Sequence, residues 1–223
     1  MAGGKAATSS RPASKRTDAP FDLDTRDVER IGDERMARAN RPSDEIEPAG
    51  LVLPIEDRDH HRGPIGARYA LVEYGDFASE RCRDLVDTLA DLSRELADDL
   101  CLSFRSFPDA QRFPEARRAA EVAEAAEEQG KFWLMHDRLF EHQSELGEAL
   151  YRKLARELPL DLDVFDRDLR SGEAARRVDE DVESGIEAGV VQAPTLFVNR
   201  RMHVGAHEFD DLLTALQRPP PSP

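Results

Sequence analysis

The sequence predicts an α/β domain in which a strand–helix–strand unit is followed by a long helical segment and a return to the sheet. The first observation is a buried strand at 70–74, followed by a helix at 79–97 and a second strand at 100–107. The second is helical spacing of apolar residues over about 75 residues beyond this unit. The third is a strand at 195–199. Because the crossover of such a unit is right-handed, its two strands are expected to lie parallel in one sheet.

Glycine and proline residues divide the helical segment. The helices expected there span 114–129, 132–142, 147–158, 164–169 and 173–188. Pro159 and Gly172 mark two of the boundaries between them. A turn at Arg200-Arg201 then follows the strand at 195–199, and a short strand at 202–204 and a final helix at 208–216 complete the domain.

The ends of the chain differ in composition from this domain. Residues 1–50 contain one aromatic side chain, Phe21, and too little apolar surface to offset the entropy of ordering, so we expect most of them to be disordered. Residues 51–65 are expected to form a linker, and 66–217 the domain. The proline-rich residues 218–223 are expected to form a C-terminal tail.

Charge and residue types exclude several classes of function. The net charge is −15, and residues 1–64 carry 11 basic and 13 acidic groups, which leaves −13 on the remainder. Such a surface repels phosphate backbones, so no nucleic-acid partner is expected. Neither His60-His61, in the expected linker, nor His203 with His207 makes a convincing metal site. Trp133 and His136 lie on an apolar helix and are expected in the core.

The sequence also bears on location and on the two cysteines. No apolar run approaches the roughly 18 residues needed to cross a bilayer, and no export signal is recognisable. We therefore expect a cytoplasmic protein without a transmembrane segment. Cys82 begins a helix that spans about 22 Å before Cys101 begins the next strand, so the two thiols should be too far apart to bridge. Cys101, between two leucines, is expected to be a buried core residue.

Several separated motifs carry a resemblance to a known family. They are Leu71 to Phe77, Ser79-Glu80-Arg81-Cys82, Phe104 to Pro108, Gln129 to Asp137 and Val190 to Asn199. In this order they resemble the DsbA-like branch of the thioredoxin superfamily, over residues 64–217. The resemblance implies a thioredoxin-like fold with a helical insertion at about 114–188, membership of a thiol-disulfide oxidoreductase family, and protein or peptide thiols or glutathione as partners. Similar domains also occur fused behind sodium/proton antiporters.

The resemblance places Ser79 where the family has its attacking cysteine. A serine hydroxyl cannot form a disulfide, so we expect weak or absent dithiol exchange and leave enzyme activity open. Two roles remain for Ser79. Its side chain can cap the helix by accepting a backbone N–H, or its hydroxyl can donate to a bound thiolate. The second role resembles that in kappa-class glutathione transferases and 2-hydroxychromene-2-carboxylate isomerases, in which case glutathione would be the cofactor.

Cys82 and the Ala193-Pro194 pair complete the candidate site. Cys82 matches the resolving position and is either an inert buried residue or a one-cysteine redox centre. The resemblance implies that Pro194 is cis and that the backbone of Ala193 offers hydrogen bonds to an extended peptide or to glutathione. Alternatively, the proline only preserves the fold. Asp76 is expected to be a turn residue or a solvated acid near the motif. A binding module without catalysis therefore competes with an oxidoreductase and a glutathione-dependent enzyme, and the oligomeric state stays open.

Overall fold

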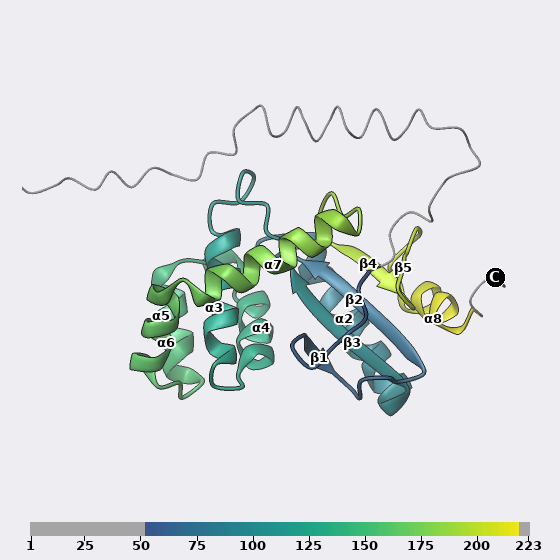
Figure 1. Ribbon diagram of the computed structural model, residues 1–223, viewed down its shortest axis with the longest axis horizontal. Coiled ribbons are helices and arrows are strands. Elements are labelled where there is room, and N and C mark those ends of the chain that lie inside the picture. The colour runs from purple at the N-terminus through teal and green to yellow at the C-terminus, as the bar shows by residue number, and fades with distance from the viewer. Residues whose placement is uncertain (1–51, 219–223) are drawn as a thin grey trace, which may run out of the picture. The chain divides into compact units, whose positions relative to one another are not determined.

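The computed structural model of the protein describes residues 52–218, and these form a sheet with helices on both faces and a helical block at one end (Figure 1). The strands are β1 (His60–Arg62), β2 (Tyr69–Gly75), β3 (Leu100–Ser106), β4 (Thr195–Val198) and β5 (Arg201–Met202). The helices are α2 (Glu80–Leu96), α3 (Ala116–Glu127), α4 (Phe132–Glu141), α5 (Glu148–Glu157), α6 (Leu162–Ser171), α7 (Glu173–Glu187) and α8 (Phe209–Gln217). These elements confirm the α/β fold class and the helical insertion.

The sheet has the strand order β1-β3-β2-β4-β5. β2 and β3 are parallel, and their register runs from Tyr69 opposite Leu100 to Gly75 opposite Ser106. The other pairs are antiparallel. β2 therefore occupies the centre, covered on both faces, which explains why its sequence is a nearly continuous apolar run rather than an alternating one. The β2–α2–β3 crossover is the strand–helix–strand unit expected from the sequence.

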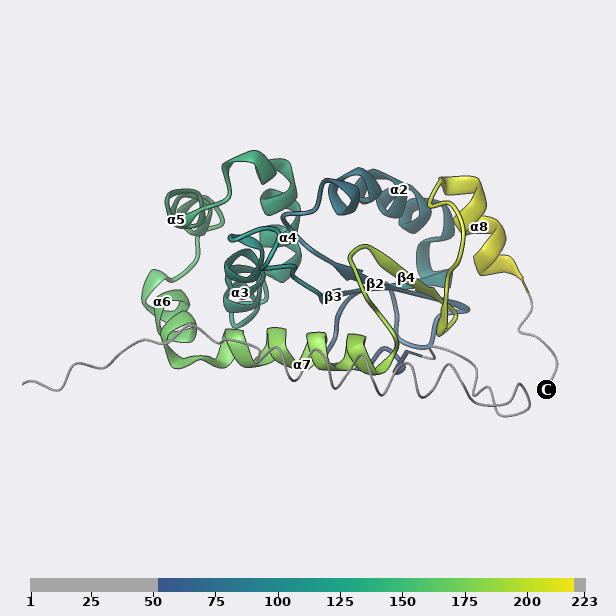
Figure 2. The same ribbon diagram turned by 90° about the horizontal axis from the view of Figure 1, so that it is seen from above.

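Helices cover the two faces of the sheet differently, as Figure 2 shows. α2 and α8 lie on one face, where leucines of both helices pack with leucines of β2 and β3. α7 crosses the other face, where the aromatic residues Tyr74 and Phe197 are buried. Each fully buried leucine or phenylalanine contributes about 1.5–3 kcal/mol relative to an exposed one, so these two layers supply much of the driving force for folding.

The helical block is built around α3, whose composition explains its position. Its sequence is rich in alanine, and Ala119, Ala123 and Ala126 are fully buried. Small side chains let neighbouring helices approach closely, and α4, α6 and α7 all pack against α3. Local signals set the limits of α6. The Asp161 carboxylate caps its start by accepting from two backbone N–H groups, and Gly172, at φ +83°, ends it.

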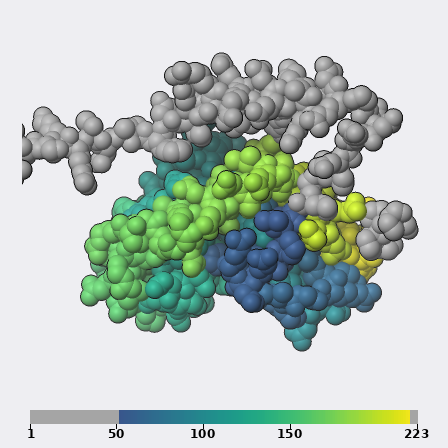
Figure 3. Space-filling model, viewed as in Figure 1, coloured from purple at the N-terminus to yellow at the C-terminus, as the bar shows by residue number. Residues whose placement is uncertain are grey.

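The prediction of a linker at 51–65 is wrong from Val52 onward, because these residues are part of the folded domain. Val52 is buried, and its N–H donates to the carbonyl of Arg200. β1 pairs antiparallel with β3 and covers an otherwise open sheet edge. In Figure 3 this dark blue segment lies against α7. The segment is too short and too charged to show a strand pattern, so backbone hydrogen bonds rather than apolar periodicity hold it.

The side chain of His60, which was expected in the linker, is also buried. Its Nε2 lies 2.9 Å from both carboxylate oxygens of Glu124, and its ring stacks on Phe132 at 3.5 Å between centroids. No group of three metal-ligating side chains occurs between residues 52 and 218. Within the same range, no helix is both long enough and apolar enough to cross a membrane. The tails expected at 1–50 and 218–223 fall outside the described residues, apart from Arg218.

Candidate active site

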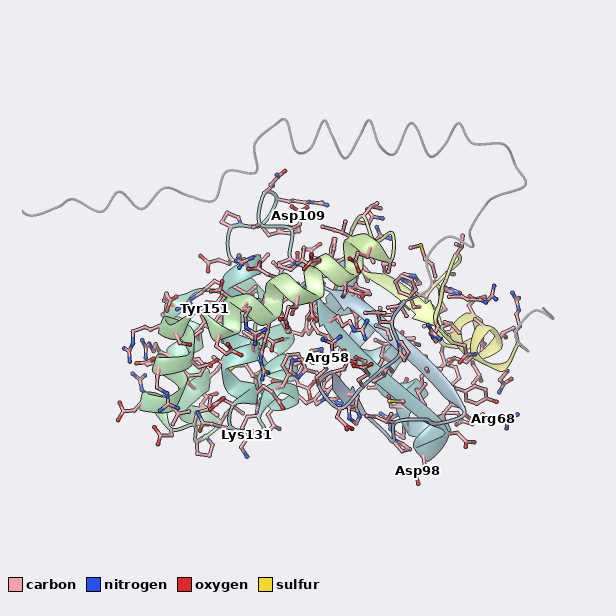
Figure 4. All side chains as sticks on the ribbon, viewed as in Figure 1. Arg58, Arg68, Asp98, Asp109, Lys131 and Tyr151 are labelled. Carbon is pink, nitrogen blue, oxygen red and sulfur yellow. The ribbon has the colours of Figure 1, made fainter. Side chains whose placement is uncertain are left out.

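Asp76 organises the turn that connects β2 to α2. Its carboxylate accepts from the N–H groups of Ala78 at 2.8 Å and Asp109 at 2.9 Å, and its carbonyl accepts from the Ser79 N–H at 3.0 Å. Figure 4 shows Asp109 in the loop beyond β3, at the opposite end of that strand from Asp98. Asp76 is buried, and this burial raises the pKa of its carboxyl. It is therefore a turn residue and not a solvated acid.

Ser79 directly precedes α2, but its side chain does not cap the helix as one interpretation predicted. Its carbonyl accepts from the N–H groups of Cys82 and Arg83, both at 3.1 Å, while its hydroxyl makes no bond to a backbone N–H. The hydroxyl instead lies close enough to the Cys82 thiol, one helical turn further on, to lower its pKa. Only 7% of Ser79 is exposed. The side chains of the two motif residues are thus neighbours.

Cys82 is buried, with 1% of its surface exposed. Its sulfur accepts a hydrogen bond from the Asp76 N–H at 3.4 Å. Burial, and next the negative charge of Glu73, raise the pKa of this thiol well above its usual range, and they outweigh the lowering by the Asp76 N–H and the nearby Ser79 hydroxyl. A protonated, covered thiol is a poor nucleophile and is slow to oxidise. This geometry supports the inert interpretation of Cys82 over the one-cysteine redox centre.

Glu73 lies behind the motif, on β2, and sequence reasoning missed it. It is 4% exposed, and its Oε1 has no hydrogen-bond partner within residues 52–218. Burial raises the pKa of Glu73 to about 8, so the carboxyl is neutral at pH 7. The signal that could have identified Glu73 in the sequence was a single acidic residue within an otherwise apolar strand. Gly75 is required beside it, since a Cβ there would lie 2.2 Å from the Phe104 ring.

Gln143 is a second residue that sequence reasoning did not single out. It lies in the 3₁₀ turn Gln143–Glu145 after α4, and its side-chain amide donates to the carbonyls of Phe77 at 2.8 Å and Ser79 at 2.9 Å. The helical block therefore holds the backbone of the motif through one side chain. Nothing in the local sequence distinguishes this glutamine, because its partners are 64 and 66 positions away.

Ala193 and Pro194 lie at the same end of the sheet as the motif. Thr195 is opposite Tyr74 in the β4–β2 ladder, so Ala193 lies level with the turn at Asp76. The half-buried Ala193 packs against the apolar cluster that contains Cys82. The Ala193–Pro194 peptide bond is cis, and Pro194 is buried. The structure thus gathers Ser79, Cys82 and Ala193 around one region.

The two cysteines lie at opposite ends of β2. Cys101 is paired with Ala70 at the start of this strand, whereas the Cys82 sulfur contacts the N–H of Asp76 just beyond its end. Six residues of strand separate these points, or about 20 Å, and a disulfide needs Cα atoms within about 7 Å. Both thiols are free and buried, as expected from the sequence.

Comparison with known proteins agrees with this architecture. Residues 56–218 match the family described as Thioredoxin. The chain belongs to the thioredoxin family. Oxidised BdbD from Bacillus subtilis is similar with a TM-score of 0.67 and 20% identity, covering 77% of this chain and 97% of that one. The thiol-disulfide exchange protein alpha-DsbA2 from Wolbachia pipientis gives a TM-score of 0.64 and 16% identity, with 72% and 87% covered. The fold is of the DsbA-like type.

Curated relatives are more similar in sequence but much longer. The chain is 39% identical over 176 residues to "Na(+)/H(+) antiporter NhaA 1" of Mycolicibacterium vanbaalenii, which covers 77% of this chain and 28% of the relative. It is 40% identical over 167 residues to "Na(+)/H(+) antiporter NhaA 1" of Salinispora arenicola, covering 74% and 26%. The chain therefore spans about a quarter of the length of these relatives.

Proposed function

We propose that this domain binds an extended segment of a protein beside Ser79 and Ala193 and does not carry out dithiol exchange. The burial and protonation of the Cys82 thiol, together with a hydroxyl at the attacking position, carry this proposal. Exchange needs a thiolate that attacks a disulfide sulfur and a second thiol that releases the product. Ser79 cannot supply the first, and Cys82 is covered in the folded domain.

The backbone around Ala193 supports the binding role. Its N–H and C=O have no partner among the backbone hydrogen bonds of residues 52–218, so they are free to pair with an added extended strand. An exposed apolar side chain also lies two residues before Ala193 in the chain. It is Val191, which is 62% exposed. Free backbone groups beside exposed apolar side chains are the features that an extended peptide recognises.

Binding and exchange are separable with a matched pair of unstructured peptides, one with a single cysteine and one with serine in its place. We expect both to shift the amide NMR signals of Ser79 and Ala193 with the same affinity, and neither to form an adduct detectable by mass spectrometry. Val191→Asp should weaken binding, while Leu134→Asp, at an exposed apolar position on α4, should not. Reduction of insulin by the natural protein, or binding of the cysteine peptide alone, would contradict the proposal.

Glutathione is the remaining alternative ligand. Ser79 is only 7% exposed, so its hydroxyl is largely covered and would have to be uncovered to donate to a glutathione thiolate. We therefore expect no shift of the Ser79 and Ala193 amides when glutathione is added. Saturable shifts at both positions would favour the glutathione-dependent enzyme over the peptide-binding module.

The curated relatives support a proposal about the partner. We propose that the bound segment belongs to a sodium/proton antiporter, because the sequences that are 39–40% identical to this chain carry that name. The test is co-purification with the Mycolicibacterium vanbaalenii antiporter lacking its matched 176 residues. Val191→Asp should abolish retention of the domain by the antiporter. Equal retention of the natural domain and of Val191→Asp would show that the Ala193 region is not the contact.

A further inference from the structure

A cavity of about 600 Å³ lies between the segment 53–60, β3 and helices α3 and α7. Figure 4 labels Arg58, which belongs to its wall. Binding sites for small molecules have volumes of roughly 300–1,000 Å³, so this cavity can hold a compound of that kind. Its wall is mainly polar, and Leu53 and Phe104 are its apolar side chains. The cavity is therefore suited to a charged ligand with a short apolar stem.

Acidic side chains outnumber basic ones on the wall of this cavity. Seven of its residues are acidic and four are arginines. Every one of these arginines is already paired with a carboxylate. The pairs are Arg105 with Asp59, Arg176 with Glu180, Arg177 with Glu124, and Arg58 with Glu56. An anionic ligand would have to displace these carboxylates, whereas a cationic ligand would reduce the excess of negative charge.

Asp181 of α7 is an acid of this wall whose charge is not compensated. Its Oδ2 accepts from the Ser106 N–H at 2.7 Å. Within residues 52–218 its other oxygen has no hydrogen-bond partner, and no cationic side chain forms an ion pair with it. Burial, and next the charge of Glu124, raise the pKa of Asp181 to about 7, which outweighs the hydrogen bond from Ser106. A carboxyl with one free oxygen therefore faces the cavity without a partner of opposite charge.

His60 of β1 reports the same shortage of positive charge. Its Nε2 lies 2.9 Å from both carboxylate oxygens of Glu124, and its Nδ1 lies 3.8 Å from Glu127. Burial by itself would lower the pKa of His60, but Glu124, Glu127 and Asp181 raise it above the ordinary value. Protons on His60 and Asp181 therefore supply positive charge that the other side chains of the wall do not.

We propose that this cavity binds a small organic cation through an alkylamine or alkylguanidine group that pairs with Asp181. Such a group carries only hydrogen-bond donors, so it satisfies the free oxygen of Asp181 and replaces the proton there. Leu53 and Phe104 offer an apolar surface to its methylene stem. The inference goes beyond the proposed function, since neither Ser79 nor Ala193 belongs to this wall.

The first test is calorimetric titration of the full chain with agmatine, which carries a guanidinium and an ammonium group on a four-carbon stem. Succinate and 1,4-butanediol are the matched anionic and neutral compounds. The titrations are done at about 0.15 M salt, which screens general attraction to an acidic protein. We expect saturable binding of agmatine alone, with shifts of the Asp181 and Ser106 amide NMR signals. The absence of saturable agmatine binding, or tighter binding of succinate, would overturn the proposal.

The source of the cation is tested with the same group on a peptide. Acetyl-Gly-Arg-Gly-amide presents a guanidinium on a protein backbone, whereas agmatine presents it on a free molecule. Tighter binding of agmatine at the Asp181 amide supports the small organic cation proposed here. Tighter binding of the peptide would overturn that part of the proposal and assign the cavity to an arginine side chain of another protein.

Affinity for agmatine should rise about tenfold between pH 6 and pH 8, because Asp181 must lose its proton to pair with the cation. The charged groups around Asp181 are Glu124 of α3, His60 of β1 and Arg105 of β3. Loss of the His60 proton as pH rises removes a competing positive charge and acts in the same direction. An affinity for agmatine that falls over this interval would contradict pairing with Asp181.

Variants of the same helix separate the site from general charge. Asp181→Asn keeps the shape of the side chain and should weaken agmatine binding by about tenfold. Asp179→Asn is the matched control, because Asp179 is on α7 but is 64% exposed and outside the cavity, and its variant should bind as the natural protein does. Glu127→Gln, at a partly exposed position of the wall, should also weaken binding and guards against misfolding of Asp181→Asn. Equal affinities of Asp181→Asn and Asp179→Asn would overturn the proposal.

Discussion

Ser79 carries an oxygen at the helix start where a thiol-disulfide enzyme carries its attacking sulfur. The environment of this atom is otherwise suited to exchange. Its hydroxyl lies near the Cys82 thiol, its carbonyl accepts from the Gln143 amide, and Ala193 lies at the same end of the sheet. Because the side chains of residues 79 and 82 are neighbours one helical turn apart, a single substitution tests whether the remaining machinery is complete.

Ser79→Cys is expected to create a reversible disulfide between positions 79 and 82 and to allow the variant to reduce insulin. The helix N-terminus favours the thiolate, so the new thiol should have a depressed pKa, although Glu80 in the first turn limits the shift. The absorbance of the thiolate as a function of pH measures the pKa of the new thiol. Mass spectrometry after alkylation detects the disulfide. The natural protein and the double variant with Cys82→Ser should stay inactive. If the variant keeps both thiols free under oxidation, positions 79 and 82 do not form an exchange pair.

At the scale of single elements, the segment before β1 shows how buried charge holds the domain together. Arg105 of β3 donates from Nε to Asp59 at 2.9 Å and from Nη2 at 3.1 Å, and both side chains are buried. Arg105 also donates to the Tyr74 hydroxyl at 3.2 Å and the Pro54 carbonyl at 3.2 Å. One guanidinium thus adds a side-chain attachment between the segment and β3, which apolar patterning cannot reveal.

Asp59→Ala should destabilise the domain by about 3–5 kcal/mol, since it leaves the Arg105 charge buried with neutral acceptors only. Glu56→Ala is the matched control, because it breaks the exposed pair with Arg58, which contributes about 1 kcal/mol or less. The midpoints of guanidinium unfolding curves give both values. Similar losses for the two variants would show that the Arg105 pair does not anchor the segment.

The elements differ in how well the sequence predicts them, for a physical reason. Strands and helices with many apolar residues, such as β2, α2 and α8, begin and end within one or two residues of the predicted limits. β1 was missed because three residues paired by backbone bonds leave no periodicity. At the site, Ser79, Cys82 and Ala193 were found from local motifs. Gln143 and Glu73 were not, because contacts distant in sequence or burial itself define their roles.

Over the whole domain, several buried or partly buried ionisable groups respond to pH in the same direction. Burial raises the pKa of Glu73 to about 8 and that of Asp181 to about 7. The pKa of His60 is also raised, because hydrogen bonding to Glu124 and nearby acids outweigh its burial. For each group the folded state binds its proton more tightly than the unfolded state does. The stability that this provides is complete below the unfolded pKa and is lost as pH rises through the folded value.

The domain is therefore expected to lose stability between about pH 4.5 and pH 8, most steeply above pH 6.5, with Glu73 making the largest single contribution. A carboxyl whose pKa rises from 4.5 to about 8 on folding changes the free energy of unfolding by about 4–5 kcal/mol over this interval. Asp137, whose pKa is lowered, acts only near or below its ordinary value of 3.8, whereas His136 and His207, whose pKa values burial lowers from 6.5, oppose the trend below that value. Repulsion among the excess acidic groups also lowers stability as the pH rises.

Glu73→Gln isolates this contribution, because the amide has nearly the same shape and no charge. The variant should be more stable than the natural protein at pH 9 and should show a flatter dependence of unfolding free energy on pH, while Asp181→Asn should remove only a smaller part of the slope. Urea unfolding at pH 5, 7 and 9 measures all three proteins. Parallel curves for the natural protein and Glu73→Gln would mean that Glu73 titrates normally in the folded state, and hence that water reaches the carboxyl more freely than its burial behind Cys82 implies.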